Sequence, residues 1–87
     1  MAFASSAAYR LDPDVALRAE PFGALAYHYG TRRLTFLRSA LLADVVRDLE
    51  GHASVDAALE ERVPPAEHPS YRRALASLAG SGFLRAC

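Results

Sequence analysis

The spacing of apolar residues changes near Leu37, and this change constrains the fold more than any other feature of the sequence. Before that point apolar and polar residues alternate, which is typical of half-buried strands. After it, apolar residues recur at helical spacing and form a stripe made of Leu41, Leu42, Val45, Val46 and Leu49. The chain therefore divides into a strand-forming half and a helix-forming half.

The first half predicts a meander of three strands, at residues 15–20, 22–29 and 32–37. Pro21 interrupts the alternation and marks a turn or an edge between the first two strands. Gly30 and Thr31 form a two-residue link with glycine first, which is suited to a type II′ hairpin. In such a hairpin Tyr29 would pair with Arg32.

The second half predicts three helices, because each segment has a start signal and a stop signal. Ser39 and Ser54 are candidate N-caps, and Pro69 suits the first turn of the third helix. The stop signals are, in chain order, Gly51, the pair Pro64 and Pro65, and then Gly80 or Gly82. The sequence therefore predicts an α+β, winged-helix-like domain in which a three-stranded antiparallel sheet is followed by three helices.

The length of 87 residues predicts a single domain over residues 1–87, with residues 1–8 as a short disordered tail. A hydrophobic content of 52% is typical of a globular chain. The formal net charge is zero, which argues against nucleic acid as the main partner. The sequence contains no apolar run of transmembrane length and no signal-peptide pattern. We therefore expect a soluble cytoplasmic protein with no membrane partner.

Residue patterns that would support catalysis or metal binding are missing from the sequence. His28, His52 and His68 have no further ligand at a metal-binding spacing, so no metal site is expected. Cys87 is the one cysteine and cannot form an internal disulfide. No phosphate-binding or nucleophile motif occurs, and no catalytic residues can be assembled. The sequence predicts a protein that is not an enzyme and has no cofactor.

The strand at residues 32–37 is the best candidate for a binding edge. It is an outer strand of the meander, contains no proline and leads directly into the first helix, so its edge can be open. Leu34 and Phe36 are expected on one side of it, with Arg33 and Thr35 on the other. A peptide that added to this edge would gain backbone hydrogen bonds.

Three arginines, Arg32, Arg33 and Arg38, flank that strand. They would favour an acidic partner through charge-assisted hydrogen bonds. They are equally compatible with solvated residues at a hairpin end, and spacing alone does not separate these interpretations.

Two stretches of the sequence resemble a known family. The segment AEPFGALAYHYGTRRLTFLRS, residues 19–39, resembles the corresponding segment of the mycofactocin biosynthesis chaperone family. The segment YRRALASLAGSGFL, residues 71–84, is similar to that family's closing helix and following strand. The resemblance extends from about Tyr9 to Leu84 and is most specific in PFGALAYHYGTRR. The family belongs with the small peptide-chaperone domains of the pyrroloquinoline-quinone pathway, which are recognition elements for ribosomally made, modified peptides.

The resemblance implies a specific role. Family members bind a precursor peptide and present it to a radical S-adenosylmethionine maturase, which decarboxylates and crosslinks the C-terminal residues of the peptide. The chaperone itself carries no iron–sulfur cluster. In related recognition elements the leader peptide lies as an added strand along the third strand, in a groove closed by the third helix.

The resemblance also implies a set of peptide-binding residues. The strand would contribute Arg33, Leu34, Thr35, Phe36 and Leu37, with Arg32 at its start. The helix would contribute Tyr71, Arg72, Leu75, Ala76 and Ala79. Two divisions of the helix residues stay open: either all five line the groove, or Tyr71 and Leu75 belong to the core.

Two other functions are compatible with the same predicted elements. A winged-helix DNA-binding regulator would place the third helix in the major groove, although Arg72 and Arg73 are the only cations on that helix. A structural subunit of a larger complex would need no peptide. Whichever function holds, the hairpin and the open edges are compatible with a monomer or with a homodimer formed by strand exchange.

Overall fold

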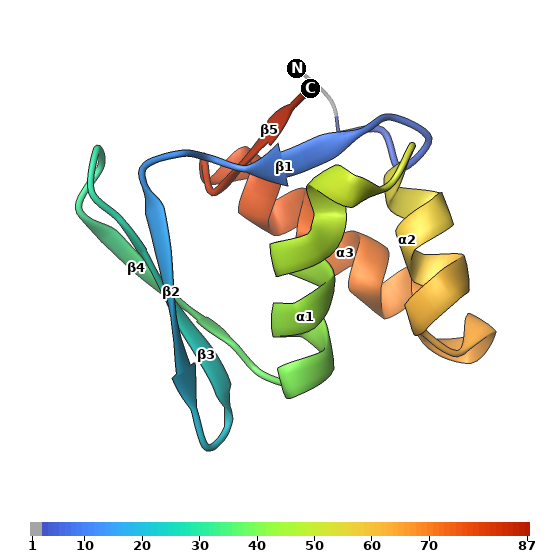
Figure 1. The fold of residues 1–87 in the computed structure, drawn as a ribbon, viewed down its shortest axis with the longest axis horizontal. Helices are drawn as coiled ribbons and strands as arrows, with labels where there is room; N and C mark the ends of the chain where they lie inside the picture. Colours follow the sequence, from blue (N-terminus) through green and yellow to red (C-terminus); the bar gives the residue numbers. More distant parts are fainter. Residues whose placement is uncertain (1–2) are drawn as a thin grey trace.

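A computed structural model describes residues 3–87 (Figure 1), and it confirms the predicted α+β class. Five strands and three α-helices follow one another in the chain, with short 3-10 turns before and after α2. The elements are β1 (Tyr9–Leu11), β2 (Val15–Glu20), β3 (Gly23–His28), β4 (Arg33–Leu37), α1 (Ala40–Asp48), α2 (Val55–Arg62), α3 (His68–Gly80) and β5 (Leu84–Ala86).

The predicted antiparallel meander is confirmed as a three-stranded sheet in the order β2-β3-β4. Side chains of β3 alternate between the two faces of this sheet, so that Ala24, Ala26 and His28 are buried while Leu25 and Tyr27 are only half-buried. In Figure 1 the sheet stands beside the helices, with α1 next to it. One face of the sheet therefore covers the core, and the other faces away from the helices.

The predicted type II′ link at Gly30 and Thr31 is wrong. The left-handed residue of this turn is Arg32, with φ of 61°, and its N–H donates to the carbonyl oxygen of His28 over 2.7 Å. The strands are thus joined by a four-residue loop, residues 29–32, and Tyr29 and Arg32 lie outside the strands. The physical reason is the imidazole of His28, whose Nδ1 accepts the backbone N–H groups of Gly30 and Thr31 and so holds both residues in the turn.

The start signals of the helices are confirmed. Ser39 Oγ accepts the N–H of Leu42, and Ser54 Oγ accepts the N–H of Ala57, each over 3.0 Å. α3 begins at His68 with Pro69 in its first turn. The core that the helices share with the sheet is contiguous, and its fully buried large side chains are Leu37, Val45, Val46, Leu49, Val55, Leu59 and Leu75.

The sequence did not predict the second, two-stranded sheet, in which β1 pairs antiparallel with β5. Of the expected disordered tail, residues 1 and 2 lie outside the described residues. In the remainder, the carbonyl oxygens of Ser5 and Ala7 accept N–H groups from Asp56 and Val55 at the start of α2. The start of the described chain therefore packs against α2, and its end pairs with β1.

Gly23 joins the sheet closely to the start of α1. Its φ is +148°, and a Cβ at this position would lie 2.2 Å from the carbonyl oxygen of Leu37 and 2.8 Å from the nitrogen of Ser39. Only glycine accommodates both the backbone conformation and this approach. The contact fixes where β4 ends and α1 begins.

None of the helices in residues 3–87 is both long enough and apolar enough to cross a lipid bilayer.

Candidate functional site

The exposed edge of β4 is the starting point of the site. Backbone N–H and C=O groups of successive residues point to opposite sides of a strand, so one known hydrogen bond fixes the direction for the whole sheet. The N–H of Tyr29 donates to the carbonyl oxygen of Asp14, on the β2 side of the chain. Ala24, Ala26 and His28 therefore direct their backbone groups towards β4, where their partners are Leu37, Thr35 and Arg33.

It follows that the backbone groups of Leu34 and Phe36 point away from β3. β4 is the last strand of the sheet, and no turn, loop or side chain in residues 3–87 forms a hydrogen bond with the backbone of either residue. Each residue thus presents one unused donor and one unused acceptor. An edge of this kind can accept another extended segment.

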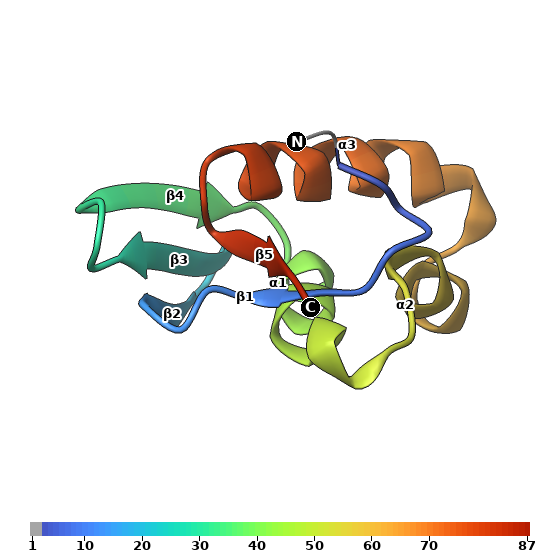
Figure 2. The same cartoon turned by 90° about the horizontal axis from the view of Figure 1, so that it is seen from above.

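A groove of about 530 Å³ lies beside this edge, between β4 and α3. In Figure 2 the strands of the three-stranded sheet follow the order β4, β3, β2 with increasing distance below α3, so β4 is the strand of this sheet nearest that helix. We call this hollow the β4–α3 groove. Its lining residues are Thr35, Phe36, Leu37, Arg38, Ser39, Leu42, Glu67, Ser70, Tyr71, Ala74, Ser77 and Leu78.

The lining of the groove is mostly apolar with a few polar groups. The hydroxyls of Ser39 and Tyr71 lie 3.4 Å apart and connect the β4–α1 junction to α3. One exposed cation, Arg38, and one exposed carboxylate, Glu67, stand among the lining residues. An apolar hollow with a few polar groups is the usual character of a ligand-binding site.

The structure brings four of the predicted site residues together around this groove: Thr35, Phe36, Leu37 and Tyr71. Leu34 lies on the exposed edge of β4, outside the lining of the groove. Arg32 belongs to the hairpin loop, and Arg33 is the exposed first residue of β4.

The other helix residues predicted for the site lie elsewhere. Leu75 is fully buried in the core, and the Nε of Arg72 lies 3.0 Å from Oδ1 of Asp56 on α2. Ala76 and Ala79 line a different hollow beneath the N-terminal segment. The reason is helical phase, since residues 72, 76 and 79 lie roughly half a turn away from the side of α3 that faces β4.

The residues of α3 that sequence reasoning missed share one side of the helix, and they are Glu67 at its start and then Ser70, Ala74, Ser77 and Leu78. Their spacing of three and four residues was the available signal. This spacing does not by itself indicate a binding surface, because most of these residues are small or carry a hydroxyl group and are equally typical of a solvated helix surface. The apolar stripe through Leu75 was easier to recognise, and it faces the core.

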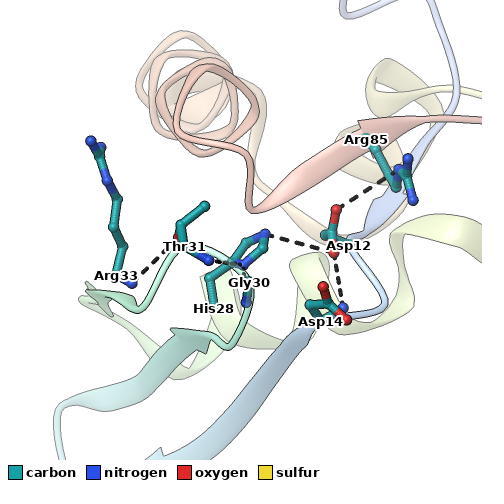
Figure 3. Close-up of polar contacts among 7 residues, drawn as sticks. All are labelled: Asp12, Asp14, His28, Gly30, Thr31, Arg33 and Arg85. Carbon is teal, nitrogen blue, oxygen red and sulfur yellow. Dashed lines mark hydrogen bonds and ion pairs between the residues drawn. The ribbon is translucent and has the colours of Figure 1, made fainter.

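A polar network holds the hairpin end of β4 in place (Figure 3). The Nδ1 of His28 accepts the N–H groups of Gly30 and Thr31, so its Nε2 carries the hydrogen and faces Asp12 Oδ1 at 3.6 Å. Asp12 also accepts the N–H of Asp14 and lies 3.8 Å from Arg85 of β5. The loop before β4 is thereby linked to the second sheet.

The unpaired charged residues that flank β4 are arginines. Within residues 3–87, five arginines form no ion pair, and three of them flank β4: Arg32 and Arg33 at its start and Arg38 after its end. The other two are Arg10 and Arg73. Arg73 is thus the one unpaired cation on the described α3, which leaves little positive charge for a DNA-reading helix.

The histidines contact structural partners. His52 Nε2 lies 2.7 Å from Glu61, and His68 Nε2 lies 2.7 Å from the carbonyl oxygen of Val63. Over the described range 3–87, no three His, Cys, Asp or Glu side chains gather where they could hold a metal ion.

Comparisons with known proteins give a consistent result. The family model of the peptide chaperone MftB family matches residues 8–85. A peptide chaperone MftB from Mycobacterium ulcerans is 46% identical over 84 residues, covering 95% of this chain and 77% of the relative. Another from Mycobacterium tuberculosis is 43% identical, covering 87% and 71%, and one from Mycolicibacterium smegmatis is 40% identical, covering 94% and 81%. No solved structure matches the chain, so the winged-helix label stays a prediction.

Proposed function

The chain belongs to the peptide chaperone MftB family, and from this premise we propose that it binds a ribosomally made precursor peptide as an added β-strand along β4. In this proposal it acts without catalysing a reaction and presents the peptide to a radical S-adenosylmethionine maturase in mycofactocin biosynthesis. The family name supports peptide binding, and the free edge of β4 supports binding of the peptide as an added strand.

The observation that carries the proposed mode is the unused backbone of Leu34 and Phe36 beside the β4–α3 groove. A strand that pairs with β4 satisfies the free N–H and C=O groups of both residues. Its side chains then alternate, with one set entering the groove between β4 and α3 and the other set continuing the outward face of the sheet. Because the groove is mostly apolar, the inward set is best filled by apolar side chains.

The unpaired arginines at both ends of β4 favour carboxylates in the bound peptide. Arg32 and Arg33 lie at one end and Arg38 at the other, and none of these forms an ion pair in residues 3–87. Charge complementarity of this kind mainly accelerates association and selects the partner. We therefore propose an acidic leader segment with apolar residues at alternate positions.

The size of the site predicts moderate affinity. A strand paired with the five residues of β4, together with a few side chains, forms an interface of about 1,200 Å² or less. A disordered peptide also loses conformational entropy when it becomes ordered. We expect a Kd of about 0.1–10 μM, which corresponds to roughly −7 to −9.5 kcal/mol. A carrier that passes its peptide to an enzyme should not bind more tightly.

Isothermal titration of the chain with the cognate leader peptide tests the proposed function. We expect saturable heat with a 1:1 stoichiometry and a Kd in this range. The control is a peptide of the same composition in scrambled order, which should bind at least tenfold more weakly. No heat at peptide concentrations of tens of micromolar would contradict the proposal.

A pull-down with the maturase, with and without peptide, tests the presenting role. A carrier should recover the maturase together with the peptide. A wild-type chain that recovers the maturase but binds no precursor peptide would instead favour a purely structural subunit.

A further inference from the structure

The outward face of the three-stranded sheet is unusually apolar for a surface. The most exposed large apolar side chains in residues 3–87 are Phe22, Tyr29, Leu34 and Phe36, with exposed fractions between 44% and 64%. Side chains alternate along a strand, so Leu34 and Phe36 lie on the side of the sheet away from the core. They are opposite Tyr27 and Leu25 of β3, respectively. We call these six residues the outer face: Phe22, Leu25, Tyr27, Tyr29, Leu34 and Phe36.

The outer face is an organised surface. The rings of Phe22 and Phe36 form an edge-to-face pair with centroids 5.6 Å apart, and those of Tyr27 and Tyr29 form another at 4.9 Å. The leucines lie between these pairs, because Leu34 is opposite Tyr27 and Leu25 is opposite Phe36. Contiguous exposed patches of this kind mark interaction sites. Apart from Phe36, none of these residues lines the β4–α3 groove.

We propose that the outer face docks the enzyme that modifies the bound peptide, through an apolar patch on that enzyme bordered by carboxylates. This inference rests on the proposed function, since it names the surface used by the partner of the same carrier. A peptide added to the free edge of β4 becomes a fourth strand of this sheet and extends the outer face. A protein seated on the outer face therefore contacts the peptide directly.

Charge around the outer face agrees with an acidic partner. Arg32, which forms no ion pair within the described residues, lies in the loop at its hairpin end. Arg18, on the outward side of β2, is paired with Glu20 but its side chain is still 74% exposed. Carboxylates at the rim of the partner would pair with these guanidinium groups.

The area of the outer face favours a transient partner over a second copy of this chain. Three strands about 4.8 Å apart and five or six residues long present a face of roughly 15 by 20 Å, or about 300 Å². Two such faces would bury about 600 Å², well below the size of a stable homodimer interface. A carrier that transfers its peptide to an enzyme requires an enzyme complex that dissociates readily.

The test compares Tyr29→Glu with Ala53→Glu. Tyr29 is exposed and lies outside the groove, and Ala53 is an exposed loop residue at the helical end of the molecule. Each variant therefore adds one carboxylate at an exposed site, and only the position differs. Each variant, loaded with fluorescent leader peptide, is titrated with the modifying enzyme, and its own peptide Kd is measured. Phe22→Glu provides a second variant of the same face, and thermal unfolding checks that each variant is folded.

With each chain saturated with peptide, we expect both outer-face variants to bind the enzyme at least tenfold more weakly than the wild type, while their peptide Kd rises no more than about threefold and Ala53→Glu changes neither affinity. Enzyme affinity within twofold of the wild type in Tyr29→Glu and Phe22→Glu would overturn the docking surface while leaving peptide binding intact. Failure of the wild type to bind peptide would overturn the proposed function itself. A wild-type dimer that Tyr29→Glu converts to a monomer would show that a second copy covers the face, which also overturns the inference.

Discussion

β4 presents two surfaces that differ in what they offer a partner. At its edge, the backbone groups of Leu34 and Phe36 are free, and the adjacent groove has a mostly apolar lining with hydroxyl groups from both the β4–α1 junction and α3. On the outer face, aromatic and leucine side chains are exposed while the strands beneath are already paired. The edge can recognise the main chain of an extended segment, whereas the outer face can recognise only side-chain features of a partner, namely its shape, its apolar character and carboxylates at its rim.

This difference indicates how the two surfaces can be separated by mutation. Truncating a side chain changes the outer face but leaves the backbone donors of the edge in place. Removing a backbone N–H changes the edge but leaves the outer face apolar. Substitutions should therefore range in effect from one that destroys both surfaces to one that adjusts a single surface.

Gly23→Ala should have the largest effect, because both surfaces depend on the same junction. An added Cβ would lie 2.2 Å from the carbonyl oxygen of Leu37, at a φ of +148° that disfavours alanine. We expect a loss of about 3 kcal/mol or more in the free energy of unfolding, measured by urea denaturation. Gly80→Ala is the control, since a Cβ added there would meet no atom within 4 Å, and it should change stability little. Equal stability of the two variants would contradict the role given to Gly23.

Leu34→Pro should separate the surfaces. The N–H of Leu34 points away from β3, so proline at this edge position is tolerated by the sheet but removes a donor and blocks an incoming strand. We expect peptide affinity to fall about tenfold or more, which is about 1.4 kcal/mol, as measured by isothermal titration.

The control for Leu34→Pro is Ala19→Pro on the opposite edge. By the same alternation the N–H of Ala19 points outward from β2, and Ala19 is exposed. This variant should bind peptide like the wild type. If both prolines weakened binding equally, the affinity would not depend on the β4 edge.

His28→Leu should loosen the end of β4 that both surfaces share. The substitution removes the acceptor of the Gly30 and Thr31 N–H groups, and we expect a loss of about 1–2 kcal/mol in unfolding free energy. His28→Asn, which keeps an acceptor on the side chain, should recover part of that loss. A fully stable His28→Leu variant would show that the turn does not need the imidazole.

Arg38→Glu should have the smallest effect and should act on the edge alone. Arg38 lies in the lining of the groove and forms no ion pair in the described chain. Reversing its charge should therefore lower the affinity for an acidic peptide about three- to tenfold at low salt. The difference should shrink at high salt. Arg73→Glu, also unpaired but outside the groove, should leave peptide affinity unchanged; an equal loss there would indicate a general effect of net charge.

The alternation along residues 15–37 and the serine caps at Ser39 and Ser54 were sufficient to predict the meander and the helices. These signals are local, and burial of one face reinforces them. The hairpin turn could not be predicted, because the imidazole of His28 overrides the local preference of Gly30. The pairing of β1 with β5 joins segments more than 70 residues apart, and no local pattern specifies it.

The strand half of the candidate site was accessible from the sequence, and the helix half was not. The edge of β4 follows from its position as the last strand of a meander, so Thr35, Phe36 and Leu37 could be placed at the groove. The orientation of α3 depends on how Leu75 packs in the core, which the sequence does not reveal. A rotation of the helix by half a turn separates Ala76 and Ala79 from the side that faces β4.

Amide hydrogen exchange at Leu34 and Phe36, with and without saturating leader peptide, tests the central claim most directly. In the free protein both amides point away from the sheet and should exchange rapidly, and in the complex both should become protected by at least tenfold. The amide of Ala19 on the opposite edge should not change. A saturated complex in which the amides of Leu34 and Phe36 still exchange at the free rate would contradict strand addition along β4.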